Sequence, residues 1–167
     1  VTDILRQRVD YPNLTFQGLH IHIGSQLSEI SATREAVQHA LAIMRPFPEL
    51  RTLNIGGGIP AHYHAGQSLP SAAAFASALS GLVDDYTLLL EPGRSIIADA
   101  GILITRLLYI KEQGGQRFYI VDASMSELMR PALYQARHDI VPLRAHPGDL
   151  QRVQVVGPVC ETTDVLG

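Results

Sequence analysis

Residues 16–26 read FQGLHIHIGSQ, and this stretch decides the fold class. Residues 16–23 are rich in types that favour β-strands, and Gly24 ends the run. Residues 28–45 then carry apolar side chains at helical spacing. A strand followed directly by a helix is the unit from which parallel α/β sheets are built, so the stretch predicts an α/β fold.

Two more strands of the same kind follow along the chain. RTLNI at 51–55 precedes three glycines at 56–58 and an alanine-rich helix predicted over residues 71–83. TLLL at 87–90 precedes EPGR at 91–94. Three strands with helices between them predict consecutive βα units of one parallel sheet.

The pattern changes after residue 98. Gly114-Gly115 separates two strand-like runs by a two-residue turn, which indicates an antiparallel hairpin rather than a helical crossover. We therefore place a domain boundary near residues 98–101, with an α/β part before it and a mostly β part after it. The elements expected in the second part are strands over residues 102–110, 117–121 and 152–156 and a short helix over residues 127–136.

The composition indicates a folded protein with a small-molecule partner. The chain has 167 residues, 46% of them hydrophobic, which is enough to form a core. A net charge of −3 with scattered arginines offers no basic stripe for nucleic acid. No apolar run reaches the ~18 residues that span a membrane, and the start of the chain lacks a signal-peptide pattern. The single cysteine, Cys160, cannot form an internal disulfide, and together these features favour the cytoplasm.

Lysine is scarce in this sequence. The chain has one, Lys111, which lies between apolar residues near the predicted end of a strand. Chemistry through an imine requires a lysine amine, but this position is typical of a lysine that reaches solvent. We therefore assign Lys111 no catalytic role.

Polar or glycine-rich residues follow each of the three predicted parallel strands. The motifs are HIHIGSQ at the end of the first strand, NIGGG at the end of the second and EPGR at the end of the third. In a parallel α/β barrel the active site lies at the carboxyl ends of the strands. The sequence therefore predicts an active site at this edge.

His20 and His22 are two residues apart on a strand, so both are expected to point to the same face. Such a pair can begin a metal site, or it can consist of two histidines that pack in the core or at its rim. Gly24 and Ser25 favour anion binding, because a glycine and a hydroxyl at a strand-to-helix turn can present donors to a phosphate. These residues alone leave the alternatives open.

Gly56, Gly57 and Gly58 allow backbone N–H groups to approach a phosphate closely, although three glycines can also form a flexible connector. Neither the GxGxxG fingerprint nor the spacing of a P-loop is present. A nucleotide is therefore not expected.

Glu91 follows an apolar strand, where a buried carboxylate needs a partner because an unpaired buried charge is costly. Arg94 can be that partner. The protonated ring nitrogen of a cofactor can serve instead, and Arg94 would then face a substrate carboxylate.

Four motifs occur in the order found in one known family. They are GLHIHIGSQ at 18–26, GGG at 56–58, EPGR at 91–94 and GPVCE at 157–161. In this order they resemble the pyridoxal-phosphate-dependent decarboxylases of the ornithine, diaminopimelate and arginine type, which have an alanine-racemase-like barrel followed by a β domain. Within this family, RPALY at 130–134 and the Cys160-Glu161 pair are most similar to the enzymes that act on diaminopimelate.

The resemblance implies an architecture and an activity. Residues 1–98 would be the C-terminal part of a (β/α)8 TIM barrel that binds pyridoxal 5'-phosphate, and residues 99–167 would be part of a C-terminal β domain. The reaction would be the decarboxylation of meso-2,6-diaminopimelate to L-lysine, a carbon–carbon lyase reaction that ends lysine biosynthesis. Members of the family form homodimers, so the implied active site is shared between subunits.

The resemblance also implies roles for individual residues. His22 would stack on the pyridine ring and Glu91 would pair with the ring nitrogen. Cys160 would give a proton to the α-carbon after carbon dioxide leaves, and Glu161 would meet the distal amino group of the substrate. The cofactor phosphate would be held by Ser25, Gly56, Gly57, Gly58, Gly93 and Arg94, and the distal carboxylate of the substrate by Arg94, Arg130 and Tyr134.

The chain departs from the family in the lysine that holds the cofactor as an imine. The family carries this lysine on an early barrel strand, and no residue here matches it. We therefore expect a fragment of a longer protein, inactive by itself. The alternatives are a decarboxylase of another amino acid such as ornithine or arginine, a non-catalytic homologue that binds pyridoxal phosphate, and a metal-dependent hydrolase that uses His20 and His22 with His62, His64 or His138.

Overall fold

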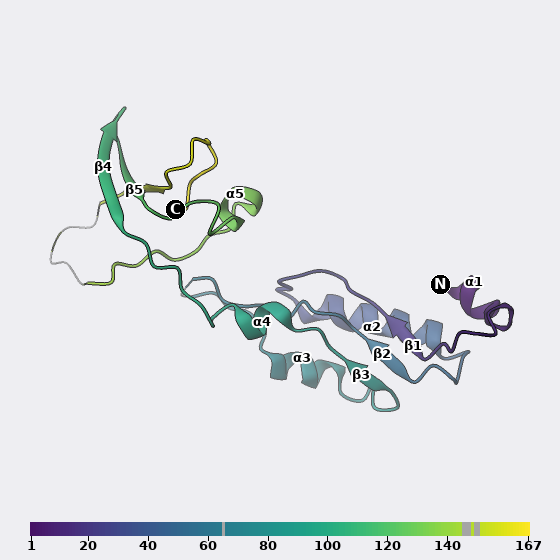
Figure 1. Ribbon diagram of the computed structural model, residues 1–167. Coiled ribbons are helices and arrows are strands. Elements are labelled where there is room, and N and C mark those ends of the chain that lie inside the picture. Colours follow the sequence, from purple (N-terminus) through teal and green to yellow (C-terminus); the bar gives the residue numbers. More distant parts are fainter. Residues whose placement is uncertain (65, 145–147, 149–150) are drawn as a thin grey trace. The chain divides into compact units, whose positions relative to one another are not determined.

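The computed structural model describes residues 1–64, 66–144, 148 and 151–167. It divides into two compact units, which are taken separately below (Figure 1). Unit 1 comprises Val1–His62 and Ser68–Gly101, and unit 2 comprises Tyr63–Gln67 and Ile102–Gly167. Among the described residues, no helix has both the length and the apolar character needed to cross a membrane.

Unit 1 is built around a parallel sheet of three short strands. The strand order is β1-β2-β3, so neighbours in sequence are also neighbours in the sheet, as expected for consecutive βα units (Figure 1). The strands are β1 (Gly18–His20), β2 (Thr52–Asn54) and β3 (Thr87–Leu89). The helices are α1 (Thr2–Arg6), the 3₁₀ helix η1 (Arg8–Asp10), α2 (Ile30–Met44), α3 (Ala72–Leu79) and α4 (Gly93–Ile97).

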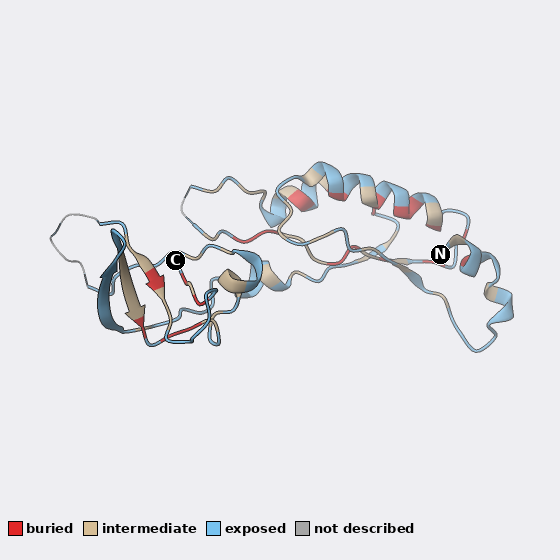
Figure 2. Cartoon of the chain, turned by 90° about the horizontal axis from the view of Figure 1, so that it is seen from above, coloured by how far each residue is buried: buried red, intermediate tan, exposed pale blue. Residues whose placement is uncertain are grey.

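The core of unit 1 forms where α2 packs on the sheet. Val37 and Met44 of α2, Leu50 after it and Leu53 of β2 are each at most 1% exposed. Residues 37 and 44 are two helical turns apart and therefore share a face, and Figure 2 shows the buried residues along one side of the helix. Burying each such side chain contributes about 1.5–3 kcal/mol, so this contact fixes the sheet that carries the strand-end motifs.

The predicted elements of unit 1 form, but they are shorter than predicted. α3 ends at Leu79 rather than at residue 83, because Gly81 adopts a φ of +78° and its N–H donates to Asp84 Oδ1. α4 is missing from the sequence prediction. It begins at Gly93, inside the EPGR motif, so this motif is the start of a helical turn rather than a simple loop.

Unit 2 contains a second sheet with the strand order β4-β5-β6. β4 and β5 are antiparallel, and the predicted hairpin is confirmed: Gly114 and Gly115 have φ values of +60° and +76°, as a type I′ turn requires. β6 pairs with β5 in parallel, and Lys111 is exposed on β4. The elements are β4 (Leu107–Gln113), β5 (Gln116–Val121), β6 (Gln154–Val156) and α5 (Arg130–Tyr134).

Two predictions for unit 2 are wrong in extent. The strand expected over residues 102–110 begins only at Leu107, where its pairing with β5 begins. The apolar character of residues 102–106 does not show whether a partner strand lies beside them. The helix expected over residues 127–136 is limited to α5. Pro131 stands in its first turn, and Gln135 ends it in a left-handed conformation with a φ of +52°.

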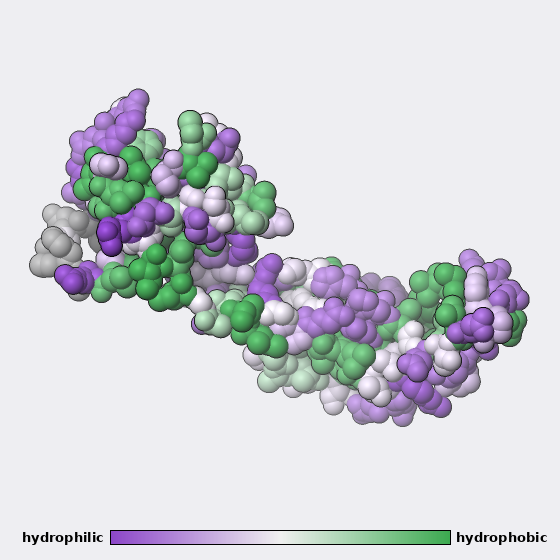
Figure 3. All heavy atoms as spheres, viewed as in Figure 1, coloured by the Kyte–Doolittle hydropathy of each residue, from purple (hydrophilic) through white to green (hydrophobic). Residues whose placement is uncertain are grey.

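We expect this chain to be poorly soluble when it is expressed alone. Every residue of β4 is exposed, and Leu107, Leu108, Tyr109 and Ile110 are 43–67% exposed. Figure 3 shows hydrophobic atoms at the surface of both units. Exposed apolar strands pair with other chains, so we expect aggregates in size-exclusion chromatography. A monodisperse preparation that melts cooperatively would contradict this expectation.

Candidate functional site

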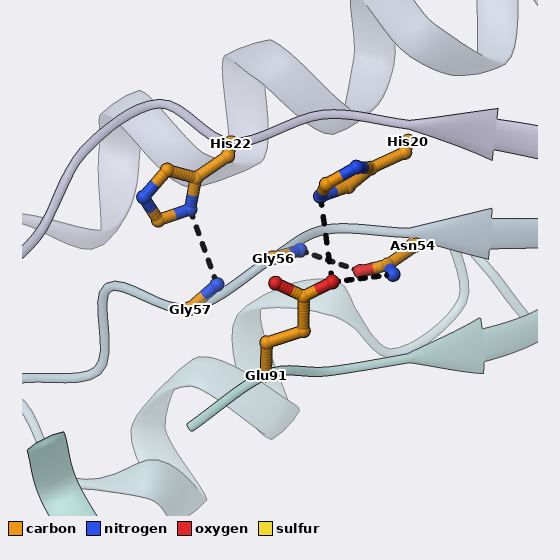
Figure 4. A network of polar contacts seen from close by, with 6 residues as sticks. All are labelled: His20, His22, Asn54, Gly56, Gly57 and Glu91. Carbon is orange, nitrogen blue, oxygen red and sulfur yellow. Dashed lines mark hydrogen bonds and ion pairs between the residues drawn. The ribbon is translucent and has the colours of Figure 1, made fainter. Parts of the chain in front are cut away.

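The three strand ends of unit 1 lie side by side. The parallel register aligns the last residues of the strands, which are His20, Asn54 and Leu89. The motifs that follow them therefore begin at the same edge of the sheet. Figure 4 shows side chains from all three segments converging there.

Glu91 is the centre of a polar network (Figure 4). Asn54 Nδ2 donates to Glu91 Oε1 at 2.8 Å, and His20 Nε2 lies 3.6 Å from the same oxygen. Asn54 Oδ1 accepts from the N–H of Gly56 at 2.8 Å, which fixes the orientation of the amide. The N–H of Glu91 donates to the carbonyl of Gly56 at 2.8 Å. The carboxylate is thus held through one of its two oxygens.

The expectation that Glu91 is buried is wrong for this chain. The side chain is 54% exposed and that of His20 is 55% exposed. Glu91 lies beyond the end of β3, which is an edge strand of the sheet, and Leu89 on β3 is itself 46% exposed. The carboxylate is therefore a half-exposed group oriented by hydrogen bonds rather than a buried charge.

The backbone orients the ring of His22. The N–H of Gly57 donates to His22 Nδ1 at 3.2 Å. An accepting Nδ1 carries no proton, so the neutral ring holds its proton on Nε2. The ring is exposed and lies on the same side of the strand ends as Glu91 (Figure 4). A flat aromatic surface is thus available beside the carboxylate.

The three glycines occupy positions where a side chain does not fit. Gly56 and Gly58 have φ values of +69° and +105°, which L side chains rarely adopt. A Cβ would meet His22 Nδ1 at Gly56, the carbonyl oxygen of Glu91 at Gly57 and Leu27 Cδ1 at Gly58, each at 2.6 Å. The glycine loop therefore packs tightly between the other two strand ends and positions both.

Replacing Gly57 with alanine is expected to destabilise the complete protein by about 1–3 kcal/mol, because the added methyl group must displace backbone. The nearest atom is the carbonyl oxygen of Glu91, which cannot rotate away as a side chain can. Thermal unfolding measures the effect. Gly101→Ala is the control, since a Cβ there meets nothing within 4 Å. An equal melting temperature for both variants would contradict the prediction.

Gln26 is a residue of this site to which sequence reasoning gave no role. Its Nε2 donates to the carbonyl of Ala61 at 2.6 Å, and its Oε1 accepts from the N–H of Ala61 at 3.1 Å. Arg94 Nη1 donates to the same Oε1 at 3.4 Å. Gln26 therefore connects the turn after β1, which includes the exposed Ser25, to the arginine of the EPGR motif. Its φ of +59°, unusual for a residue other than glycine, marks a constrained position.

Arg130, Tyr63 and His138 form a cluster in unit 2. The Cζ atom of Arg130 lies 4.5 Å from the ring centroid of Tyr63, a cation–π contact, and its Nη1 lies 3.1 Å from His138 Nε2. The rings of Tyr63 and His138 meet edge to face with centroids 5.6 Å apart. Two ring contacts thus constrain the guanidinium group. Tyr134, at the end of α5, is 73% exposed.

Burial, and next the charge of Arg130, lowers the pKa of His138 below its ordinary value of 6.5. The unfolded chain therefore takes up a proton at higher pH than the folded chain. We expect the free energy of unfolding to fall as pH drops below about 6.5 and to level off below the folded pKa. Unfolding of the complete protein at several pH values should show a smaller loss for His138→Gln. An unchanged pH profile in that variant would contradict the assignment.

Cys160 and Glu161 lie together on an exposed loop of unit 2. The hydroxyl of Thr162 donates to Glu161 Oε1 at 3.0 Å. This bond, together with backbone hydrogen bonds from Thr162 and Thr163, lowers the pKa of Glu161 below its ordinary value. The carboxylate is therefore ionised at neutral pH and suited to bind a cation.

A metal site finds no support in the described part of the chain. No group of three or more histidine, cysteine, aspartate or glutamate side chains there could hold a metal ion. His20 approaches Glu91, while His138 contacts Arg130. Two histidines of the metal-hydrolase alternative, His20 and His138, are thus engaged in other contacts.

Residues 9–167 match the model of a protein family described as pyridoxal-dependent decarboxylase, C-terminal sheet domain. The chain belongs to this family. The resemblance and the cofactor class inferred from the four motifs are thereby confirmed. The match extends over both units, so the glycine loop, Glu91 and the loop of Cys160 all lie within it.

Named relatives agree with this assignment. The chain is 40% identical to diaminopimelate decarboxylase of Vibrio cholerae over 93% of its own length and 39% of the relative's. It superimposes on AQ1208 from Aquifex aeolicus with a TM-score of 0.92 and 36% identity, covering 99% of this chain and 44% of that one. For diaminopimelate decarboxylase from Helicobacter pylori complexed with L-lysine, the TM-score is 0.81 with 36% identity over 99% and 42%. The chain thus spans about two fifths of the length of these relatives. The predicted fold class, the end of a barrel followed by a β domain, is confirmed.

The residues at the strand ends fit a pyridoxal cofactor. Among the described residues, both polar contacts of the Glu91 carboxylate fall on Oε1, so Oε2 is available to a protonated ring nitrogen. The exposed ring of His22 supplies an aromatic face beside it. The N–H groups of Gly56 and Gly57 already have acceptors in Asn54 and His22, so these two amides reach a phosphate only by exchanging partners.

Proposed function

We propose that this chain is the C-terminal-side part of a decarboxylase that converts meso-2,6-diaminopimelate to L-lysine with pyridoxal 5'-phosphate. The arrangement of Glu91 carries the proposal. One oxygen of the carboxylate is held by Asn54 and His20 while the other has no polar contact among the described residues, and the ring of His22 lies at the same edge of the sheet (Figure 4). Within a family of pyridoxal-dependent decarboxylases this arrangement suits the ring nitrogen of the cofactor.

The residues of unit 1 bind and tune the cofactor in this proposal. Glu91 keeps the ring nitrogen protonated, and His22 stacks on the ring with the tautomer set by Gly57. Pyridoxal phosphate, when bound, supplies an electron sink for the electron pair left by the departing carboxylate. The phosphate is bound near Ser25, the glycine loop, Gly93 and Arg94, and the amides of Gly56 and Gly57 exchange their present acceptors to reach it.

The residues of unit 2 bind the substrate and complete the reaction in this proposal. Arg130 and Tyr134 recognise the distal carboxylate, for which a guanidinium group constrained by Tyr63 and His138 is well suited. The ionised Glu161 binds the distal ammonium group. Cys160 gives the proton from its Sγ to the α-carbon.

The proposal extends to the organisation of the complete protein. Residues 1–98 belong to a TIM barrel that binds pyridoxal phosphate, and residues 99–167 belong to a C-terminal β domain. The complete protein supplies the lysine that holds the cofactor, forms a homodimer and works in the cytoplasm. The shares of 39% and 44% that the chain covers in its relatives support a longer natural protein.

Carbon dioxide release by the product of the complete reading frame tests this function. We expect release from meso-diaminopimelate that depends on pyridoxal phosphate, and none from ornithine or arginine. Release from one of those amino acids instead would keep the cofactor roles and overturn the substrate. No release from any of them would favour a non-catalytic homologue.

A further inference from the structure

Asp164 is a buried carboxylate that the proposed function does not use. It is 3% exposed, and it lies three residues after the Gly157–Glu161 segment, called the cysteine loop here because it carries Cys160. Burying an ionised carboxylate is costly unless hydrogen bonds compensate it. Its position therefore requires donors.

The donors are backbone N–H groups from two different segments. Asp164 Oδ2 accepts from the N–H of Val159, inside the cysteine loop, at 2.8 Å. Asp164 Oδ1 accepts from the N–H of Met125, in the segment after β5, at 2.6 Å. Among the ion pairs of the described residues, none involves Asp164. The carboxylate therefore acts as a bridge between two backbone segments.

The start of the cysteine loop is fitted to the same carboxylate. A Cβ on Gly157 would clash with both carboxylate oxygens of Asp164, so a side chain there would displace the carboxylate. The N–H of Gly157 donates to the carbonyl of Asp164 at 3.0 Å, and the N–H of Asp164 donates to the carbonyl of Glu161 at 3.1 Å. The loop is thus tied to Asp164 at its start, its middle and its end.

We propose that Asp164 is a positioning residue that holds the cysteine loop in the shape in which Cys160 and Glu161 act. This inference rests on the proposed function for what the two side chains do. The pinning of the loop consists of the two hydrogen bonds that Asp164 accepts from the N–H groups of Val159 and Met125. It does not depend on the proposed function. Cys160 is exposed, and the backbone of the loop sets where its Sγ lies.

Asp164→Asn in the complete protein tests the proposal. Asparagine has one acceptor oxygen, so it keeps at most one of the two bonds and turns an amide donor toward the other N–H. We expect hydrogen exchange in residues 157–164 to become about tenfold faster or more, since a bond to a charged acceptor is lost. The alkylation rate of Cys160, followed by mass spectrometry with iodoacetamide, should change with it. Asp139→Asn, at an exposed site in the same unit, is the matched control.

Measurements of kcat and KM distinguish a residue that positions the catalytic loop from one that only stabilises the fold. We expect kcat to fall about tenfold or more and KM to rise in Asp164→Asn, because the loop carries both Cys160 and Glu161, while the affinity for pyridoxal phosphate stays near the wild-type value. A loosened loop with unchanged kcat would overturn the positioning role. Unchanged exchange and alkylation would overturn the pinning.

One readout depends neither on the variant nor on the reaction. In the wild-type protein, the amides of Val159 and Met125 should exchange more slowly than that of Cys160, and equal rates would overturn the proposal even if Asp164→Asn does not fold. If the wild-type protein releases no carbon dioxide from any amino acid, the proposed function fails. Exchange and alkylation still decide the pinning in that case.

Discussion

Replacing Glu91 with glutamine in the complete protein is expected to lower kcat by about 10²- to 10³-fold, the usual effect of removing one preorganised electrostatic group. Glutamine keeps the size of the side chain and can still accept the bond from Asn54. It removes the charge that would keep a ring nitrogen protonated. The ring would then accept the electron pair of the departing carboxylate poorly. Rates of carbon dioxide release at saturating substrate and cofactor measure the change.

Glu35→Gln is the control for this prediction, because it makes the same chemical change at an exposed position of α2. It should leave kcat, KM and cofactor affinity unaltered. A value of kcat for Glu91→Gln close to that of the control would contradict the role of Glu91. The absorbance of the bound cofactor provides a second readout, since it responds to the protonation state of the ring without turnover.

The order of the elements follows from local signals in the sequence. The apolar spacing along residues 28–45 predicts α2, and Gly114-Gly115 predicts the hairpin, because each signal acts within a few residues. The lengths do not follow in the same way. β4 begins at Leu107 rather than at residue 102 because a strand extends only as far as its partner β5 allows, and that depends on register.

The candidate site is also predicted by local signals only in part. Motifs at strand ends bring His20, His22 and Glu91 together, because parallel strands end at one edge. The network that orients Glu91 depends on Asn54, and the link to Arg94 depends on Gln26. Both are contacts between side chains 37 and 68 residues apart. No local pattern predicts them, although a polar residue two positions before three glycines is a signal that can be followed in other chains.

The exposure of Glu91 shows a further limit of sequence reasoning. An apolar strand such as TLLL predicts burial, yet Leu89 and Leu90 are each 46% exposed. β3 is an edge strand of the sheet in this chain, so its apolar side chains have fewer elements to pack against. Whether a carboxylate at a strand end is buried depends on the elements that pack against the strand. The composition of the strand does not predict those elements.

Replacing Cys160 with alanine is expected to lower kcat by about 10²- to 10⁴-fold, the range that a positioned general acid contributes. The Sγ proton is the one that this chain would deliver to the α-carbon after carbon dioxide leaves. Cys160→Ser should also be impaired, because a hydroxyl gives up its proton far less readily than a thiol. Substrate binding involves other side chains in the proposal, so KM should change little in either variant.

The matched comparison for Cys160 is Glu161→Gln, at the next position of the same exposed loop. If the two side chains have the proposed roles, Glu161→Gln should mainly raise KM, because it weakens the contact with a distal ammonium group. Cys160→Ala should instead mainly lower kcat, because a proton donor acts in the transition state. The same pattern of KM and kcat in both variants would show that the loop acts only by its shape. Opposite patterns require that the loop present two side chains with separate chemical functions.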